Sequence, residues 1–261
     1  MTSASYDWPA PAPGAAPLPA MVGAQAGLEL RILVRNGEQL LLTLIIPVLL
    51  LTAFSLERLV SYGAVRRIDF LVPGILALAV LSTAFTSQAI ATGFERRYGV
   101  LKRLGATPLS RRGLLAAKTL SVATVELGQA VVIVAVGLAL GWHPHLGGAA
   151  VPVAAALMLA GTAAFSGLAL LLAGTLRAEA TLAGANLIYL VLLGTGGMVF
   201  PLSKFPGGAQ AALKLLPSGA LSDGLHAVLQ AGAGLPAADL LVLLGWAAAG
   251  GALAAAFFRW E

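Results

Sequence analysis

Six long apolar stretches dominate this chain of 261 residues and constrain its fold more than any other feature. They are residues 39–56, 70–92, 117–141, 150–174, 181–201 and 238–258. Each is close to the roughly 20 residues that a helix needs to cross about 30 Å of hydrocarbon. Lipid offers no hydrogen-bond partner to backbone N–H and C=O groups, so crossing segments must be helical. The sequence therefore predicts an all-α integral membrane protein with six transmembrane helices.

The amino-acid composition supports the same fold class and excludes several kinds of protein. Apolar residues make up 59% of the chain and charged residues 10%, whereas soluble domains average about 45–50% and about 25%. A very apolar soluble core is the alternative, but few amphipathic elements remain to cover it. Cysteine is absent, which excludes a disulfide framework, a thiolate metal site and a cysteine nucleophile.

The residues before the first apolar stretch predict a tail followed by a surface helix. Residues 1–27 contain five of the 14 prolines among Ala and Gly, a composition typical of a disordered tail. They lack the basic start and continuous apolar run of a secretory signal. In residues 28–38, Arg31 and Arg35 lie one helical turn apart beside apolar residues. We expect this segment to be an amphipathic helix at the membrane interface.

The distribution of Lys and Arg side chains predicts the orientation in the membrane. With six crossings, eleven of the 16 basic residues fall on one side and five on the other. Cytoplasmic segments carry the excess of positive charge, so we expect both termini in the cytoplasm and the protein in the cell membrane. Most of this charge lies in one short loop, which suits lipid headgroups or an acidic protein groove better than nucleic acid.

The loop between the second and third stretches, residues 93–116, has features beyond its positive charge. Tyr98, Leu101 and Leu104 recur at helical spacing while charged residues occupy other faces, which predicts a short amphipathic helix. Gly105 is placed to end this helix. The alternative is a basic loop whose only role is to fix the topology.

The same loop contains a motif with a counterpart in a known family. Glu95, Gly99, Leu101 and Leu104 form the pattern E-x-x-x-G-x-L-x-x-L, and a turn of small residues and Pro at 105–108 precedes a basic patch. The motif resembles the cytoplasmic loop of ABC-2 type permeases, the membrane subunits of one class of ATP-binding-cassette exporters. The order of predicted elements resembles that family as well, from the interfacial helix through the six spans.

The resemblance implies a transport subunit that places this loop, as a coupling helix, on a separate cytoplasmic ATPase. The implied coupling residues are Glu95, Arg96, Arg97, Gly99, Leu101 and Leu104. The sequence has no G-x-x-x-x-G-K-[ST] motif, so we expect no enzyme activity from this chain itself, and ATP and Mg²⁺ would be used by the partner. We expect this chain to bind no cofactor or metal. The resemblance implies that it forms a homodimer, or a heterodimer with a related permease, in contact with membrane lipids. The expected substrate of export is amphipathic or lipid-like.

The segment before the last stretch, residues 202–236, is rich in Pro and Gly and contains two apolar pieces. Both pieces are too short to cross a bilayer. Their charge places them outside, and together with the resemblance this predicts two short re-entrant helices that dip into the outer leaflet. An ordinary external loop is the alternative.

A few polar residues inside the predicted spans are candidates to line a translocation path. Glu126 is the strongest, because a carboxylate in the middle of a span costs about 2.5–3.5 kcal/mol on insertion scales and must face protein or water. Gln129 lies near the same helical face, and Asn186 and Tyr189 form a second candidate stripe. The alternative is that these side chains only join helices by hydrogen bonds.

Two further functions compete with the permease. A secondary transporter could use Glu126 to carry a coupling proton, and it would work without an ATPase. An intramembrane enzyme or scaffold would require several reactive groups at one depth. Glu126 is the only ionised residue in the middle of any of the six stretches, because Lys118 lies at the edge of the third and Asp239 at the edge of the last. His143 and His145 have no carboxylate nearby in the sequence and make a poor metal site.

Overall fold

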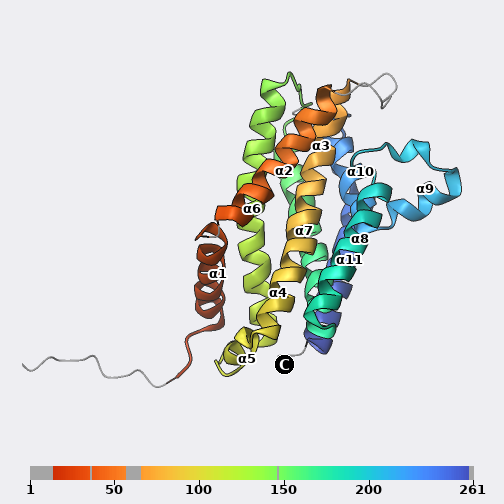
Figure 1. Ribbon diagram of the computed structural model, residues 1–261. Helices are drawn as coiled ribbons and strands as arrows, with labels where there is room; N and C mark the ends of the chain where they lie inside the picture. Colours follow the sequence, from red (N-terminus) through yellow and green to blue (C-terminus); the bar gives the residue numbers. More distant parts are fainter. Residues whose placement is uncertain (1–13, 36, 57–65, 146, 259–261) are drawn as a thin grey trace, which may run out of the picture.

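All regular structure in the described part of the chain is helical. A computed structural model describes residues 14–35, 37–56, 66–145 and 147–258, including their side chains except those of 38–42. The long helices lie side by side in one elongated bundle (Figure 1). The predicted all-α fold class is confirmed for these residues.

Five helices in the described ranges are long and apolar enough to cross a membrane. The first, Arg67–Arg97, combines α3 (Arg67–Val80), a π-helical segment η1 (Leu81–Ser87) and α4 (Gln88–Arg97), and the others are α6 (Arg111–Ala139), α7 (Ala150–Thr175), α8 (Ala178–Thr195) and α11 (Ala237–Phe257). Each overlaps one of the predicted stretches. The remaining stretch, 39–56, lies in α2 (Gly37–Leu56), but the apolar part of α2 whose side chains are described, Thr43–Leu56, is shorter than a full span.

The N-terminal surface helix begins earlier than the sequence predicts. Helix α1 covers Leu18–Arg35, so residues 18–27 are helical and not part of a disordered tail; residues 1–13 lie outside the described part. Pro19 falls in the first turn, where its missing N–H costs no hydrogen bond. Met21 and Val22 pack against buried Leu side chains of other helices. Composition alone missed this packing, because Pro and Ala also suit a disordered chain.

The residues of the predicted amphipathic helix in the loop 93–116 are divided between two helices. Glu95, Arg96 and Arg97 form the last turn of α4, and the following helix α5 covers only Val100–Gly105. Gly99 separates the two with a φ of 71°, a left-handed conformation that glycine adopts without steric cost. The predicted short helix is therefore present as α5 and ends at Gly105 as predicted, but Glu95, Arg96 and Arg97 belong to the preceding helix.

Two short helices, α9 (Gly207–Lys214) and α10 (Pro217–Leu229), occupy the segment before the last span. Helix α10 packs against α7 and α3, whereas α9 has no buried residue and projects from the bundle (Figure 1). An ion pair of 2.8 Å between Lys214 Nζ and Asp223 Oδ2 joins α9 to α10, and this contact raises the pKa of Lys214. The predicted helices exist, and their position relative to the membrane stays a prediction.

The most extensive contact between any two described helices lies between α7 and α11. A Cβ atom added to Gly167 would lie 2.7 Å from the backbone nitrogen of Gly251 and 2.8 Å from the carbonyl carbon of Gly250. Small residues allow such close packing in membranes, where helices associate by van der Waals contact. The absent side chain of Gly167 is therefore part of this interface.

Candidate functional site

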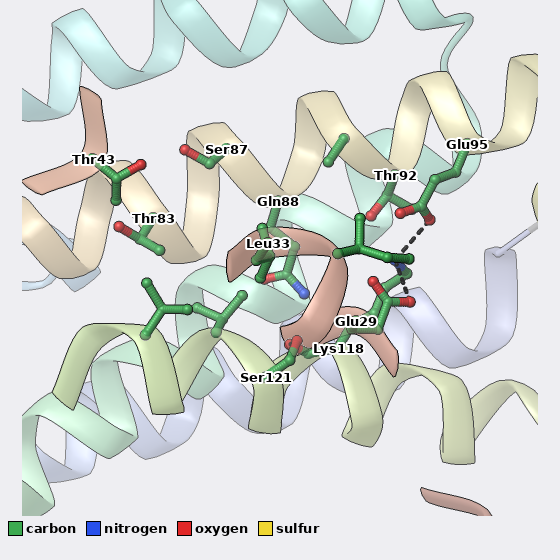
Figure 2. A pocket seen from close by; sticks show the side chains of 14 residues that line it. Glu29, Leu33, Thr43, Thr83, Ser87, Gln88, Thr92, Glu95, Lys118 and Ser121 are labelled. Carbon is green, nitrogen blue, oxygen red and sulfur yellow. Dashed lines mark hydrogen bonds and ion pairs between the residues drawn. The ribbon is translucent and has the colours of Figure 1, made fainter. Parts of the chain in front are cut away.

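A buried cluster of three charges joins three helices (Figure 2). Lys118 on α6 has a side chain only 4% exposed, and its Nζ atom lies 3.0 Å from Glu29 Oε1 on α1 and 2.7 Å from Glu95 Oε2 on α4. Both carboxylates are also largely buried, at 13% and 25% exposure. We call these residues the Lys118 cluster. It connects the N-terminal helix to two of the long helices.

The cluster has an energetic consequence for the fold. Removing charges from water costs several kcal/mol per ion, and close pairing offsets this cost only while every partner is present. With both carboxylates ionised, the Lys118 cluster carries two negative charges and one positive charge. A net charge of about −1 is unusual for a buried cluster, and it attracts a further cation.

Sequence reasoning placed all three residues near the inner face but did not bring them together. In the sequence, Lys118 lies at the edge of the basic loop, Glu29 in the predicted surface helix and Glu95 in the coupling motif. Long sequence separations between Lys118 and both carboxylates explain the failure, since no local spacing connects them. A lysine inside an apolar run without an acidic residue at i±4 was the only available signal.

A cavity of about 100 Å³ lies beside the Lys118 cluster, between α1, α2, α4 and α6. Gln88 and Thr92 line it, and both side chains are more than nine-tenths buried. Neither the side-chain amide of Gln88 nor the hydroxyl of Thr92 has a hydrogen-bond partner among the described residues. The π-helical segment η1 contributes Thr83 and Ser87, and such irregular turns occur often at functional sites.

The coupling residues expected from the resemblance do not form one exposed surface. Glu95 points inward to the Lys118 cluster. Arg96 donates a hydrogen bond to the carbonyl oxygen of Leu176 at the end of α7, and Arg97 pairs with Glu179 in the first turn of α8. Both contacts fasten the end of α4 to these two helices.

The remaining coupling residues lie at the turn and in α5. Gly99 supplies the turn, Leu101 is completely buried and Leu104 is half-buried. Leu101 packs in a small cluster with side chains of α6, with Leu109 and with Phe258 at the end of α11, and α1 covers this cluster. The exposed face of α5 consists instead of Lys102 and Arg103, with Tyr98 and Val100 beside it.

The structure places Glu126 inside the bundle. Its side chain is 3% exposed, and Thr162 on α7 donates a hydrogen bond to Oε2. The other oxygen, Oε1, is buried without a hydrogen-bond partner among the described residues. One hydroxyl donor compensates only part of the cost of burying a carboxylate. Glu126 therefore remains a candidate to line the translocation path.

Gln129, three residues further along α6, joins helices. Its amide nitrogen donates to the carbonyl oxygen of Thr43 on α2 over 2.8 Å, and its amide oxygen accepts from Thr83 Oγ1 over 3.1 Å. Both ends of the side chain are therefore satisfied. These contacts agree with the packing alternative for Gln129.

The second candidate stripe, on α8, is not brought next to Glu126 by any described hydrogen bond. Asn186 is exposed and donates to the carbonyl oxygen of Leu182 in its own helix. Tyr189 is half-buried and lines a separate cavity of about 210 Å³ with Pro47 and Leu78. Within one copy of the chain, the candidate path residues therefore form two separate pairs, one on α6 and one on α8.

The described residues contain no group of three or more His, Asp or Glu side chains that could hold a metal ion.

The comparisons with known proteins address the class of protein. A family model described as ABC-2 family transporter protein matches residues 66–258. The comparison with curated proteins gives no match. The matched range includes Glu95 and Lys118 but not Glu29.

Proposed function

Because the chain belongs to the ABC-2 family of transporters, we propose that it is the permease subunit of an ATP-driven exporter. Members of this family are transmembrane subunits that generally work with a cytoplasmic ATPase subunit. The chain is accordingly a multi-pass membrane protein and the membrane permease of an ABC transporter. The proposal adds the direction of transport, an amphipathic or lipid-like substrate and the route of coupling.

The proposed topology has six spans, with α2 as the first, both termini in the cytoplasm and α9 and α10 as re-entrant helices at the outer leaflet of the cell membrane. Figure 1 supports this arrangement, because α1, α5 and the last turn of α11 lie at one end of the bundle while α10 lies toward the other. The basic residues of α5 then face the cytoplasm, as the positive-inside rule requires.

The observation that carries the coupling proposal is the continuous helix Arg67–Arg97, which ends one glycine turn before α5. A partner that pushes on the exposed face of α5 would move the end of this helix as a unit, because packed elements shift as units. Glu95 fastens that end to α6 through Lys118, and Lys118 extends the connection to Glu29 on α1. We therefore propose that the Lys118 cluster transmits the movement of the ATPase to two further helices.

A second copy of the chain, or a related permease, completes the proposed transporter. Helix α8 exposes large apolar side chains, among them Leu187 and Leu190, which need a covering of lipid or protein. Asn186 lies on the same helix and is exposed. In the dimer, the path is proposed to run between the copies, with Asn186 and Tyr189 lining it and Glu126 as a further candidate.

The alternative is a proton-coupled secondary transporter, and the surroundings of Glu126 favour considering it. Its carboxylate is buried and has one hydrogen-bond partner, Thr162, among the described residues. A buried carboxylate of this kind can exchange a proton during transport. The two proposals differ in their energy source, which an experiment can separate.

We expect transport to depend on a partner ATPase and not on a proton gradient. The full chain is reconstituted in vesicles with and without the co-purified P-loop ATPase, and uptake of fluorescent amphiphiles is measured with ATP or with an imposed proton gradient. ATP-dependent uptake that requires the ATPase supports the exporter. Uptake driven by the gradient alone, and lost in Glu126→Gln, would contradict it and establish the alternative.

The coupling role of Glu95 is tested in the same reconstituted complex. In Glu95→Gln, the carboxamide keeps the shape of the side chain but removes the charge that holds α4 to Lys118, so substrate-stimulated ATP hydrolysis is expected to fall by about tenfold. Membrane insertion should be unchanged, because Lys118 keeps its pair with Glu29. Asp223→Asn, which removes a carboxylate from an ion pair in the segment before the last span, is the matched control. Equal stimulation in Glu95→Gln and the control would refute the coupling role.

A further inference from the structure

The cavity beside the Lys118 cluster has buried polar groups that find no hydrogen-bond partner among the described residues. Gln88 and Thr92 are four residues apart on α4, and Glu95 follows three residues later, so all three lie along one side of the helix (Figure 2). Gln88 as a whole residue is 6% exposed, and Thr92 is completely buried. Burying such groups without hydrogen bonds costs about 1–3 kcal/mol each. Two of them in one cavity make this cavity a candidate binding site for a polar ligand.

The size and the remaining lining of the cavity narrow the choice of ligand. A cavity that holds one water needs about 10–15 Å³, and this one measures about 100 Å³. Its wall also contains apolar side chains from two helices, including Leu33 on α1 and Val122 and Val125 on α6. The ligand therefore has a polar end and a short apolar part.

The charge of the cluster decides the sign of the polar end. With both carboxylates ionised, Glu29 and Glu95 carry two negative charges against the single ammonium of Lys118, and both carboxylates line the cavity. A cation is attracted by the surplus negative charge, and an anion is repelled. The carbonyl oxygen of Gln88 and the hydroxyl oxygen of Thr92 are both acceptors, which an N–H group requires.

We propose that this cavity binds the ammonium group of a small amphipathic amine. Its N–H groups donate to the carboxylate of Glu95, to Gln88 Oε1 and to Thr92 Oγ1, and its short alkyl chain lies against Leu33 and Val125. Such a ligand balances the charge of the Lys118 cluster and supplies hydrogen-bond donors to two buried acceptors, Gln88 Oε1 and Thr92 Oγ1, that have no partner among the described residues. The proposal concerns binding to the permease alone and goes beyond the exporter function.

The test measures binding of n-butylammonium to the full chain in nanodiscs of neutral phosphatidylcholine. Thermal unfolding is followed at constant ionic strength, because a ligand that binds only the folded state raises the midpoint in a saturable way. We expect this rise with n-butylammonium, and none with n-butanol, butyrate or sodium ions. An equal rise with n-butanol would show apolar partitioning only. An equal rise with sodium ions, or no rise with the amine, would likewise overturn the proposal.

Variants of the unpartnered side chains locate the site. Thr92→Val is nearly isosteric and Gln88→Leu keeps most of the volume, and each is expected to weaken binding by about tenfold, the effect of one hydrogen bond to a charged group. Ser166→Ala is the matched control, because Ser166 also has a buried hydroxyl without a described partner but does not line the cavity. Wild-type affinity in both cavity variants would overturn the assignment, and Thr92→Val keeps this test valid if Gln88→Leu fails to fold.

Discussion

Replacing Lys118 by methionine is expected to lower the free energy of unfolding by about 3–5 kcal/mol, the usual cost of removing one partner from a buried ion pair. Methionine fills much the same space, so the loss comes from the charge and not from a cavity. Without the ammonium, the carboxylates of Glu29 and Glu95 are left buried near one another. Their mutual repulsion and their lost solvation then act against the folded state.

This prediction is measured by reversible unfolding of the variant in mixed micelles with increasing SDS. Lys214→Met is the matched control, because Lys214 also pairs with a carboxylate but is half exposed, and surface pairs contribute only about 0–1 kcal/mol. Adding Glu29→Gln and Glu95→Gln to Lys118→Met should recover most of the loss, since the buried charges are then gone. A loss in Lys118→Met no larger than in the control would contradict this account of the cluster.

Replacing Gly167 by alanine is expected to cost about 1–3 kcal/mol, the usual effect of overpacking. The new methyl group would meet the backbone of Gly250 and Gly251 on α11, and backbone atoms cannot move aside as a flexible side chain can. The two helices must therefore separate slightly along their most extensive contact. The loss of van der Waals contact is costly because lipid supplies no hydrophobic force that holds helices together.

The same unfolding assay checks this second prediction. Gly184→Ala on α8 is the matched control, because a Cβ atom there meets no other atom within 4 Å. Alanine also favours a helix over glycine by about 1 kcal/mol, so the control is expected to be neutral or slightly stabilising. If both variants behaved alike, close contact between α7 and α11 would not be a source of stability.

Much of the fold follows from features that the sequence displays locally. The apolar stretches near 70–92, 117–141 and 150–174 correspond to long helices of the structure. Gly105 ends the helix of the loop as predicted. The helix α1 was only partly foreseen, because its start at Leu18 depends on contacts with distant residues and not on its own composition.

The candidate site was predictable in part. The motif around Glu95 identified the segment, and the polarity of Glu126 identified a buried carboxylate. The inward direction of Glu95 was not predictable, because it depends on the rotation of α4 relative to α6. That Gln88 and Thr92 have no hydrogen-bond partner among the described residues was equally unpredictable, since both residue types are ordinary in a helix and only the surrounding helices decide their contacts.

The sequence by itself determined that this chain forms apolar helices in a membrane, and its loop motif indicated the family. Both follow from properties that each segment carries alone, namely its length, its preference for lipid over water and its order of residues. Only the tertiary structure decided that Lys118 lies between Glu29 and Glu95 beside a polar cavity. Such a meeting depends on the rotation and depth of three helices at once, and these are fixed by packing between segments that are far apart in the chain.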